Sequence, residues 1–394
     1  MSAAVRAGRL AGVIAGVVIM APGCGRGIAL EPGIEHATPD ARVDDGDAAA
    51  PGRDAAAGLD DAAAPDGTHD DAADDDAQDG DDDAAPMPDR APTAAWDAAE
   101  DDDTPPPPFA FISLAFTPEG ALAMGANDGS VRLLQPNQQT ISPPLLMAAT
   151  AVTALAFARD GSLIATGGDG HIVLWAQPAR TELRTIDARV DSIGTLAFSP
   201  DGALVLAGAN GATGDVSLFH TDSGALAATL TDANRAAFSA DGKLVLAVGG
   251  GFARLWTIDG QLVRGFGSAL AIRGAALSPD GTRIAISGSD TLEMRRVDGG
   301  AQLWAEYVTL GEAGGTIFFM ANGTKAAVRG DMAIAVHDSL TGKPTHQIAL
   351  LGSTPIVACD GRLVGIAFGD EVQLWRLSDG MRVVAATLWP RGKA

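Results

Sequence analysis

One short motif recurs seven times between Phe116 and Gly361: an apolar run that ends in a turn resembling Ser-Pro-Asp-Gly. The clearest copy is Phe198-Ser-Pro-Asp-Gly202, and the least regular copy is Val357-Ala-Cys-Asp-Gly361. Successive turn glycines are 38 to 42 residues apart. A self-similar unit of this length constrains the architecture strongly, because each unit must pack against its neighbours. The turn glycines are Gly120, Gly161, Gly202, Gly242, Gly281, Gly323 and Gly361.

Each unit has the pattern of four short strands. In the second unit we expect strands over 153–157, 162–166, 171–175 and 181–186. Apolar and small residues alternate in these runs, and Gly, Asp and Pro bound them, which is typical of strands joined by tight turns. No part of this unit keeps an apolar stripe at helical spacing for three turns. The repeats therefore predict an all-β chain.

The repeated motif resembles the WD40 repeat family. In the second unit, a Gly-Asp-Gly turn at Gly168–Gly170 follows the first turn, and the third run ends in Leu174-Trp175. The resemblance covers about residues 109–389 and implies a seven-bladed β-propeller with one four-stranded antiparallel sheet per blade. Because each blade can be built from contiguous chain, we expect the first and seventh blades to close the ring by packing.

An aromatic residue marks the end of the third strand in this family. Trp175, Trp256 and Trp375 stand fourteen residues after their turn glycines, and Phe219 takes the same place after an insertion around 211–214. We expect these residues to fill the wedge between neighbouring blades. Arg295 and His337 depart from the pattern, so we expect looser or wetter interfaces at the fifth and sixth blades. Leu134 stands at the same position in the first unit.

The family also tends to pair an Asp between strands two and three with a His before strand one. The chain has six histidines, and none precedes a first strand at a suitable distance. We therefore expect each Asp to bond backbone amides of its own turn, as Asp side chains commonly do. The candidates are Asp128, Asp169, Asp290, Asp331 and Asp370.

Residues 1–24 are interpreted as an export signal of the lipoprotein type. Arg6 and Arg9 precede an apolar stretch, Leu10–Met20, that is shorter than the roughly 20 residues of a membrane-spanning helix. Ala21-Pro-Gly-Cys24 then resembles a bacterial lipoprotein box, which implies a lipid anchor on Cys24 in the cell envelope. The alternative is an ordinary secretory signal. Because no Asp follows Cys24, the outer membrane is favoured over the inner one.

Residues 25–108 carry most of the negative charge of the chain. They hold 22 Asp and 3 Glu but only 4 Arg, and the whole chain has a formal charge of −23. We expect a disordered, extended tether that leads into a propeller domain over residues 109–394. A calcium loop over 74–83 is the alternative, although Ala77 and Pro86 stand where an EF-hand-like loop needs ligands. The acidity disfavours nucleic acid as a partner.

The propeller region shows no catalytic or metal-binding constellation. Its histidines are scattered over three repeats, and motifs such as His-Glu-Xaa-Xaa-His and Cys-Xaa-Xaa-Cys do not occur. We therefore expect no enzymatic activity, no metal and no cofactor. The only cysteines are Cys24 and Cys359, so a lipidated Cys24 would leave no disulfide pair.

These features favour a monomeric, non-catalytic propeller that acts as a scaffold for protein partners at the envelope. One alternative is a propeller enzyme or small-ligand-binding protein, lactonase-like or quinoprotein-like, which would need a polar cluster at the channel mouth. Another is a structural part of an envelope assembly complex. We expect partners to contact the face formed by the loops between blades and by the turns that join second and third strands. Candidate contacts there are Asn127, His171, Arg235 and Arg273.

Overall fold

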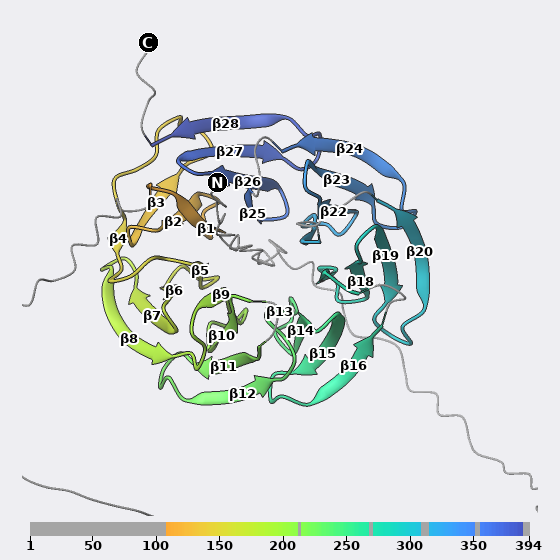
Figure 1. Ribbon diagram of the computed structural model, residues 1–394, viewed down its shortest axis with the longest axis horizontal. Helices are drawn as coiled ribbons and strands as arrows, with labels where there is room; N and C mark the ends of the chain where they lie inside the picture. The colour runs from red at the N-terminus through yellow and green to blue at the C-terminus, as the bar shows by residue number, and fades with distance from the viewer. Residues whose placement is uncertain (1–107, 212–213, 268–270, 309–314, 351–354, 389–394) are drawn as a thin grey trace, which may run out of the picture. The chain divides into compact units, whose positions relative to one another are not determined.

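The computed structural model describes residues 108–388, except 212–213, 268–270, 309–314 and 351–354. Within these ranges, 28 strands form seven four-stranded antiparallel sheets around a central axis, as the blades of a propeller (Figure 1). The all-β, seven-bladed architecture predicted by the repeats is confirmed. The signal over 1–24, Cys24 and the tether up to residue 107 lie outside the described residues, so those predictions remain predictions.

Each blade is one contiguous stretch of chain, and its strands pair in sequence order from the axis outward. Blades 1 to 4 consist of β1 (Phe111–Phe116), β2 (Leu122–Ala126), β3 (Ser130–Leu134), β4 (Leu146–Met147), β5 (Ala154–Phe157), β6 (Leu163–Gly168), β7 (His171–Ala176), β8 (Thr181–Asp187), β9 (Ile193–Phe198), β10 (Leu204–Ala209), β11 (Val216–His220), β12 (Leu226–Leu230), β13 (Arg235–Phe238), β14 (Leu244–Gly249), β15 (Phe252–Thr257) and β16 (Leu262–Phe266). Blades 5 to 7 consist of β17 (Gly274–Leu277), β18 (Arg283–Ser287), β19 (Thr291–Arg296), β20 (Gln302–Tyr307), β21 (Ile317–Phe319), β22 (Lys325–Arg329), β23 (Ala333–Asp338), β24 (Pro344–Ala349), β25 (Ile356–Cys359), β26 (Leu363–Phe368), β27 (Glu371–Arg376) and β28 (Arg382–Thr387).

The ring closes where blade 1 meets blade 7. Phe111 and Leu122 of blade 1 share an apolar cluster with Leu374 of blade 7. The backbone N–H of Phe111 also donates to the carbonyl of Gly369 at 2.9 Å. Within the described ranges each sheet is made of four consecutive strands, so neither end contributes a strand to the other's sheet. Closure by packing is therefore confirmed.

A β-bulge recurs at the position of the family's Trp. The pairing between third and fourth strands shifts register at this residue in blades 2 to 7. A bulge places one extra residue on one strand of the pair, so a repeated bulge marks equivalent positions. Blade 1 differs, because its outer strand β4 has two residues. The equivalent residues are Trp175, Phe219, Trp256, Arg295, His337 and Trp375.

The four aromatic residues at the bulge pack at the interface with the preceding blade. Phe219 is 2% exposed and belongs to a cluster made of blades 2 and 3. Trp175 packs on a cluster of blades 1 and 2, Trp256 on one of blades 3 and 4, and Trp375 on one of blades 6 and 7. Large aromatic side chains therefore fill four of the wedges between blades.

Hydrogen bonds near the axis link each of blades 1 to 4 to the blade that follows it. The shared pattern is a side chain on the first strand, or directly before it, that donates to a backbone carbonyl at or just before the start of the next blade's first strand. The bonds are Ser113 Oγ to Val152 O (2.6 Å), Thr153 Oγ1 to Ile193 O (2.6 Å), Thr195 Oγ1 to Asn234 O (3.4 Å) and Arg235 Nη1 to Arg273 O (3.1 Å).

Blade 5 makes the same link from its second strand. Gly274 occupies the first-strand position and pairs across the sheet with Ser287, whose Oγ donates to Gly315 O at 2.8 Å. In blade 1 the two residue types are exchanged, because Ser113 pairs with Gly125. The pair of one hydroxyl and one glycine is thus kept, while its orientation across the two strands is reversed.

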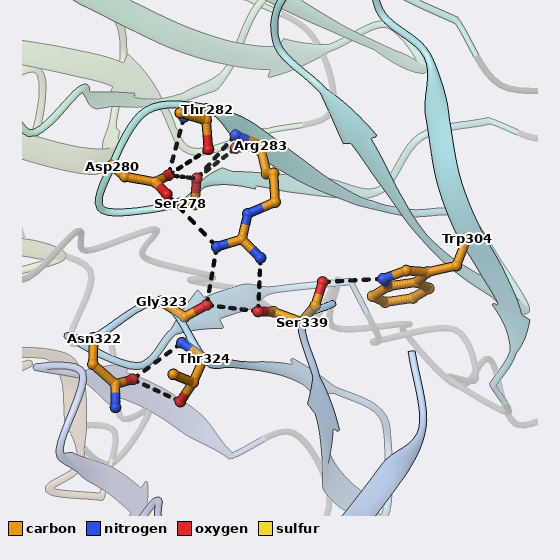
Figure 2. A network of polar contacts seen from close by, with 9 residues as sticks. All are labelled: Ser278, Asp280, Thr282, Arg283, Trp304, Asn322, Gly323, Thr324 and Ser339. Atoms are coloured by element: carbon orange, nitrogen blue, oxygen red, sulfur yellow. Dashed lines mark hydrogen bonds and ion pairs between the residues drawn. The ribbon is translucent and has the colours of Figure 1, made fainter. Parts of the chain in front are cut away.

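A polar network joins blades 5 and 6 (Figure 2). Arg283 lies at its centre: Nη1 donates to Ser339 Oγ at 2.9 Å, and Nη2 donates to Gly323 O at 3.3 Å. Trp304 of β20 donates from Nε1 to Ser339 O at 3.0 Å. From Arg295 and His337, the sequence predicted looser or wetter interfaces at the fifth and sixth blades. The structure places a defined set of hydrogen bonds between them, with donors from blade 5 and acceptors from blade 6.

Candidate functional site

The central channel contains a cavity of about 380 Å³ at the end where the Asp-Gly turns lie. All seven blades line it, through the last residues of their first strands and the turns that follow. The shared feature of the lining is a large apolar side chain at the end of the first strand, which six of the seven blades have. Six of them are Phe116, Phe157, Phe198, Phe238, Leu277 and Phe319.

The lining is mostly apolar, with charge at two places only, Arg159 and Asp360. These two residues lie on the blades that flank blade 1. The polar cluster that a propeller enzyme was expected to place at the channel mouth is therefore replaced by Phe, Leu, Ala and Pro in this half of the channel. Such a surface favours contact with an apolar group over recognition of a polar substrate.

Cys359 also lines the cavity, and its thiol is buried. Burial raises the pKa of Cys359 to about 12, against a smaller opposing effect of the Gly361 N–H, which donates to Sγ at 3.2 Å. Because the thiolate is the nucleophile, a thiol with this pKa stays protonated and unreactive at neutral pH.

The turns around the cavity mouth are held by internal hydrogen bonds. In blade 3, Ser199 Oγ donates to Asp201 Oδ1 at 2.5 Å and accepts from the N–H of Leu204 at 2.9 Å. Blades 4 and 5 repeat this arrangement with Ser239 and Ser278. The hydrogen bond from Ser199 lowers the pKa of Asp201, so its carboxylate stays ionised well into the acid range.

The five Asp residues predicted to support turns lie on the opposite face, between second and third strands. Asp128 Oδ1 accepts from the N–H of Ser130 at 2.8 Å, within its own turn. Asp169 has a left-handed backbone, with φ of 43°. The carbonyls of Asp290 and Asp370 accept from the amides that directly follow the outer strands, and the charge of Asp331 acts on Arg329. The Asp of the Asp-Gly motif was not among these candidates, and it is this Asp that repeatedly accepts hydrogen bonds within its own turn.

Two of the predicted partner contacts, Asn127 and His171, lie in separate blades on that opposite face. Asn127 donates from Nδ2 to Pro108 O at 2.9 Å and accepts at Oδ1 from the N–H of Ala110 at 3.0 Å. Its amide therefore holds the chain where it enters blade 1. His171 is exposed at the start of β7.

The other two predicted contacts, Arg235 and Arg273, are brought together by the 3.1 Å hydrogen bond from the Arg235 guanidinium to the Arg273 carbonyl. A third arginine, Arg329 at the end of β22, is 3% exposed, and its pKa is lowered by burial and, to a smaller extent, by the charge of Arg235. Sequence reasoning missed Arg329, because nothing local shows that a second strand of blade 6 approaches a first strand of blade 4.

Neither a metal centre nor a membrane-spanning helix is found in the part of the chain that the structure describes. No three His, Cys, Asp or Glu side chains of residues 108–388, outside the four gaps, are grouped so as to hold a metal ion. Over the same ranges, no helix is long and apolar enough to cross a membrane.

The family model for the WD domain, G-beta repeat, matches residues 145–176. This range spans β4 of blade 1 and β5, β6 and β7 of blade 2, so it includes the first Asp-Gly turn of blade 2 and Trp175. No curated protein matches the chain. Blade 2, which holds three of the four matched strands, has the same four-strand arrangement as the other blades. The chain therefore contains a WD40 repeat within a seven-bladed β-propeller.

Proposed function

We propose that this protein is a non-catalytic scaffold that binds protein partners through the apolar mouth of its channel, lipid-anchored to the bacterial envelope through Cys24. The WD40 match supports the first part, since propellers with this repeat are typical interaction scaffolds. The observation that carries the proposal is the cavity mouth, to which seven blades contribute apolar side chains.

The mouth suits a partner that inserts a large apolar side chain. Binding energy at protein interfaces is concentrated in a few aromatic or other large side chains that fill well-packed pockets. The surrounding turns are held by Ser-Asp and backbone hydrogen bonds, so little conformational entropy is lost when a partner docks. A single apolar anchor in the channel, surrounded by contacts to the rim turns, is the geometry we expect.

Blocking the mouth tests this part of the proposal. Ala240 is an exposed rim residue of the cavity, and Ala240→Trp would place an indole across its opening. Ala305→Trp, on the exposed outer strand β20, is the matched control. With the full chain as bait in cross-linking capture, we expect recovery of specific partners to fall about tenfold or more for Ala240→Trp, the loss of a typical hot-spot contact. Equal recovery by both variants would contradict binding at the mouth.

The anchor requires its own experiment. Cys24→Ala should move the protein from the detergent phase to the aqueous phase in phase separation and abolish incorporation of radiolabelled palmitate. Gradient separation of inner and outer membranes then tests the preference for the outer membrane. If Cys24→Ala partitions like the wild type, the lipid anchor is wrong, whatever the propeller binds.

A second candidate function is binding of a small apolar ligand in the cavity. Its volume of about 380 Å³ falls in the range of small-molecule sites, roughly 300–1,000 Å³. Native mass spectrometry of the full chain, isolated without detergent, would show an added mass that Ala240→Trp removes. A protein partner and no added mass would favour the scaffold; the reverse would favour ligand binding.

A further inference from the structure

Arginines from three blades converge at the end of the channel opposite the cavity. Arg235 begins β13, Arg273 directly precedes β17, and Arg329 ends β22. The Arg235 guanidinium is fixed by its bond from Nη1 to Arg273 O at 3.1 Å. Arg329 is buried, and its carbonyl accepts from the N–H of Gly315 at 2.9 Å, a residue on which a Cβ would lie 2.7 Å from the Cβ of Arg273. Arg235 and Arg273 are 38 positions apart in the sequence, and Arg273 and Arg329 are 56 positions apart. The fold thus gathers three distant arginines at one end of the channel.

Arg235 has hydrogen-bonding capacity to spare. A guanidinium carries five N–H donors, and within the described residues the bond to Arg273 is the one that Arg235 makes. None of its other donor atoms is among the buried side-chain atoms of the described residues that lack a hydrogen-bond partner, and Arg235 as a whole is half-buried. The side chain is therefore largely withdrawn from water, while part of its donor fork stays accessible at the channel end.

A comparison with other blades shows that the inter-blade bond does not require an arginine. Thr153 and Thr195 make the equivalent link to the next blade with a hydroxyl, and so does Ser113. Arg235 makes the same bond and adds a positive charge that the ring does not need for closure. This excess charge is what calls for a functional explanation.

Two arginines at the same end of the channel, both partly or wholly removed from water, are costly for the folded state. Burial lowers the pKa of Arg235, and burial together with the charge of Arg235 lowers the pKa of Arg329. Exposed Asp331 acts in the opposite direction on Arg329. A bound anion would add to the effect of Asp331 and offset the repulsion between the guanidiniums.

We propose that Arg235 and Arg329 form a binding site for an oxyanion, a carboxylate or a phosphate, at this end of the channel. The planar guanidinium fork matches the oxygen spacing of both groups. Arg273 contributes its carbonyl as the fixed point for Arg235. The site is independent of the apolar mouth, which lies at the other end, so either can fail without the other.

Calorimetric titration of the full chain at low ionic strength tests the site with two probes, inorganic phosphate and N-acetyl-aspartate amide. We expect saturable binding of at least one probe, and the tighter one identifies the source of the oxyanion. Arg235→Thr keeps a hydroxyl for the bond to Arg273 O, as in blades 2 and 3, and should weaken binding about tenfold or more, the loss expected for a charge-assisted hydrogen bond.

Arg254→Thr is the matched control, since Arg254 lies on β15 of the same blade and forms an ion pair with Asp232 at 3.6 Å. It should bind the probe with unchanged affinity. Arg329→Lys keeps the charge without the fork and should give an intermediate loss. The proposal is overturned if neither probe binds the wild-type chain. It is equally overturned if Arg235→Thr or a second variant, Arg235→Gln, binds like the wild type while retaining its thermal midpoint.

Discussion

Blades 3 and 5 have the same four-stranded architecture but differ at three equivalent positions of their interfaces with neighbouring blades. The residue two positions after the turn glycine is the buried Leu204 in blade 3 and Arg283 in blade 5. The residue at the bulge is Phe219 in blade 3, whereas in blade 5 it is Arg295, paired with Glu293 at 3.0 Å. The inter-blade hydroxyl lies on the first strand in blade 3 and on the second in blade 5.

The difference shows that the backbone geometry of the ring is kept while the chemistry of its interfaces changes. Blade 3 meets its neighbours through apolar burial, which is non-directional and tolerates small shifts. Blade 5 also shares an apolar cluster with blade 6, but it adds directional hydrogen bonds around Arg283. Blade 6 continues this pattern, because Lys325, at the position of Arg283, donates from Nζ to Ser378 O of blade 7 at 3.1 Å. Single substitutions at the polar interfaces of blades 5 and 6 should therefore lower the free energy of unfolding more than comparable substitutions in blade 3.

The largest expected effect is that of Gly274→Ala in blade 5. A Cβ at this position would lie 1.7 Å from the carbonyl oxygen of Gly315, a backbone atom of blade 6. The two blades would have to move apart, and we expect a loss of about 4 kcal/mol, at the severe end for a single substitution. Urea unfolding measures it.

Gly265→Ala is the control for that substitution, because a Cβ at Gly265 meets nothing within 4 Å. It should change the free energy of unfolding by less than about 0.5 kcal/mol. A mild effect of Gly274→Ala would show that blades 5 and 6 are not in the close contact on which the comparison rests.

Arg283→Leu should have the next largest effect. It installs the residue found in blade 3 but removes the donors to Ser339 and Gly323 and the contact with Asp280 at 3.7 Å. We expect a loss of about 2 kcal/mol in the free energy of unfolding, since hydrogen bonds to charged groups contribute roughly 1.5–3 kcal/mol.

Arg283→Lys sharpens the same comparison, because blade 6 has Lys325 at this position. It keeps the charge but not the two-pronged contact, and should lose about half as much as Arg283→Leu. If Arg283→Leu proved as stable as the wild type, apolar packing would be sufficient at this interface and the network would be dispensable.

The smallest expected effect concerns the turn of blade 3 and depends on pH. The hydrogen bond from Ser199 and the N–H of Ala203 lower the pKa of Asp201 in the folded state. Its contribution to stability is therefore present above the unfolded pKa of about 3.9 and is lost as the pH falls through the lowered folded value.

Asp201→Asn should accordingly be less stable than the wild type at pH 7, and the difference should shrink below about pH 4. Urea midpoints at several pH values from 7 downward measure it, with the exposed Asp298→Asn of blade 5 as control. A difference between wild type and Asp201→Asn that did not change with pH would show that the carboxylate charge is not what stabilises the turn.

The repeats alone predicted the number of blades, the contiguous build of each blade and the closure by packing. They succeeded because the spacing of turn glycines reflects a unit that must pack on its neighbours. The equivalence of Phe219 with the tryptophans was also recoverable, since its offset follows from the insertion around 211–214. The recurring bulge supports it with an independent structural criterion.

The sites were less predictable, because they depend on residues from several blades. Each apolar residue before a turn has an ordinary role in its own strand, and the cavity arises only where all seven meet. Arg329 has no local pattern that connects it with Arg235. The exchanged positions of Gly274 and Ser287 could likewise not be predicted from the sequence. They depend on the pairing of two strands and on the approach of the blade 6 backbone at Gly315.

The closure of the ring has a mechanical consequence. In the described residues no strand is shared between the chain ends, so the seam between blades 1 and 7 is held by side chains and the single backbone bond from Phe111 to Gly369 described above. Blade 1 also has the shortest outer strand, β4. The ring can therefore open at this seam without breaking the strand pairing of any sheet. We expect amide hydrogen exchange to begin in β1 and β4 before it reaches the middle blades.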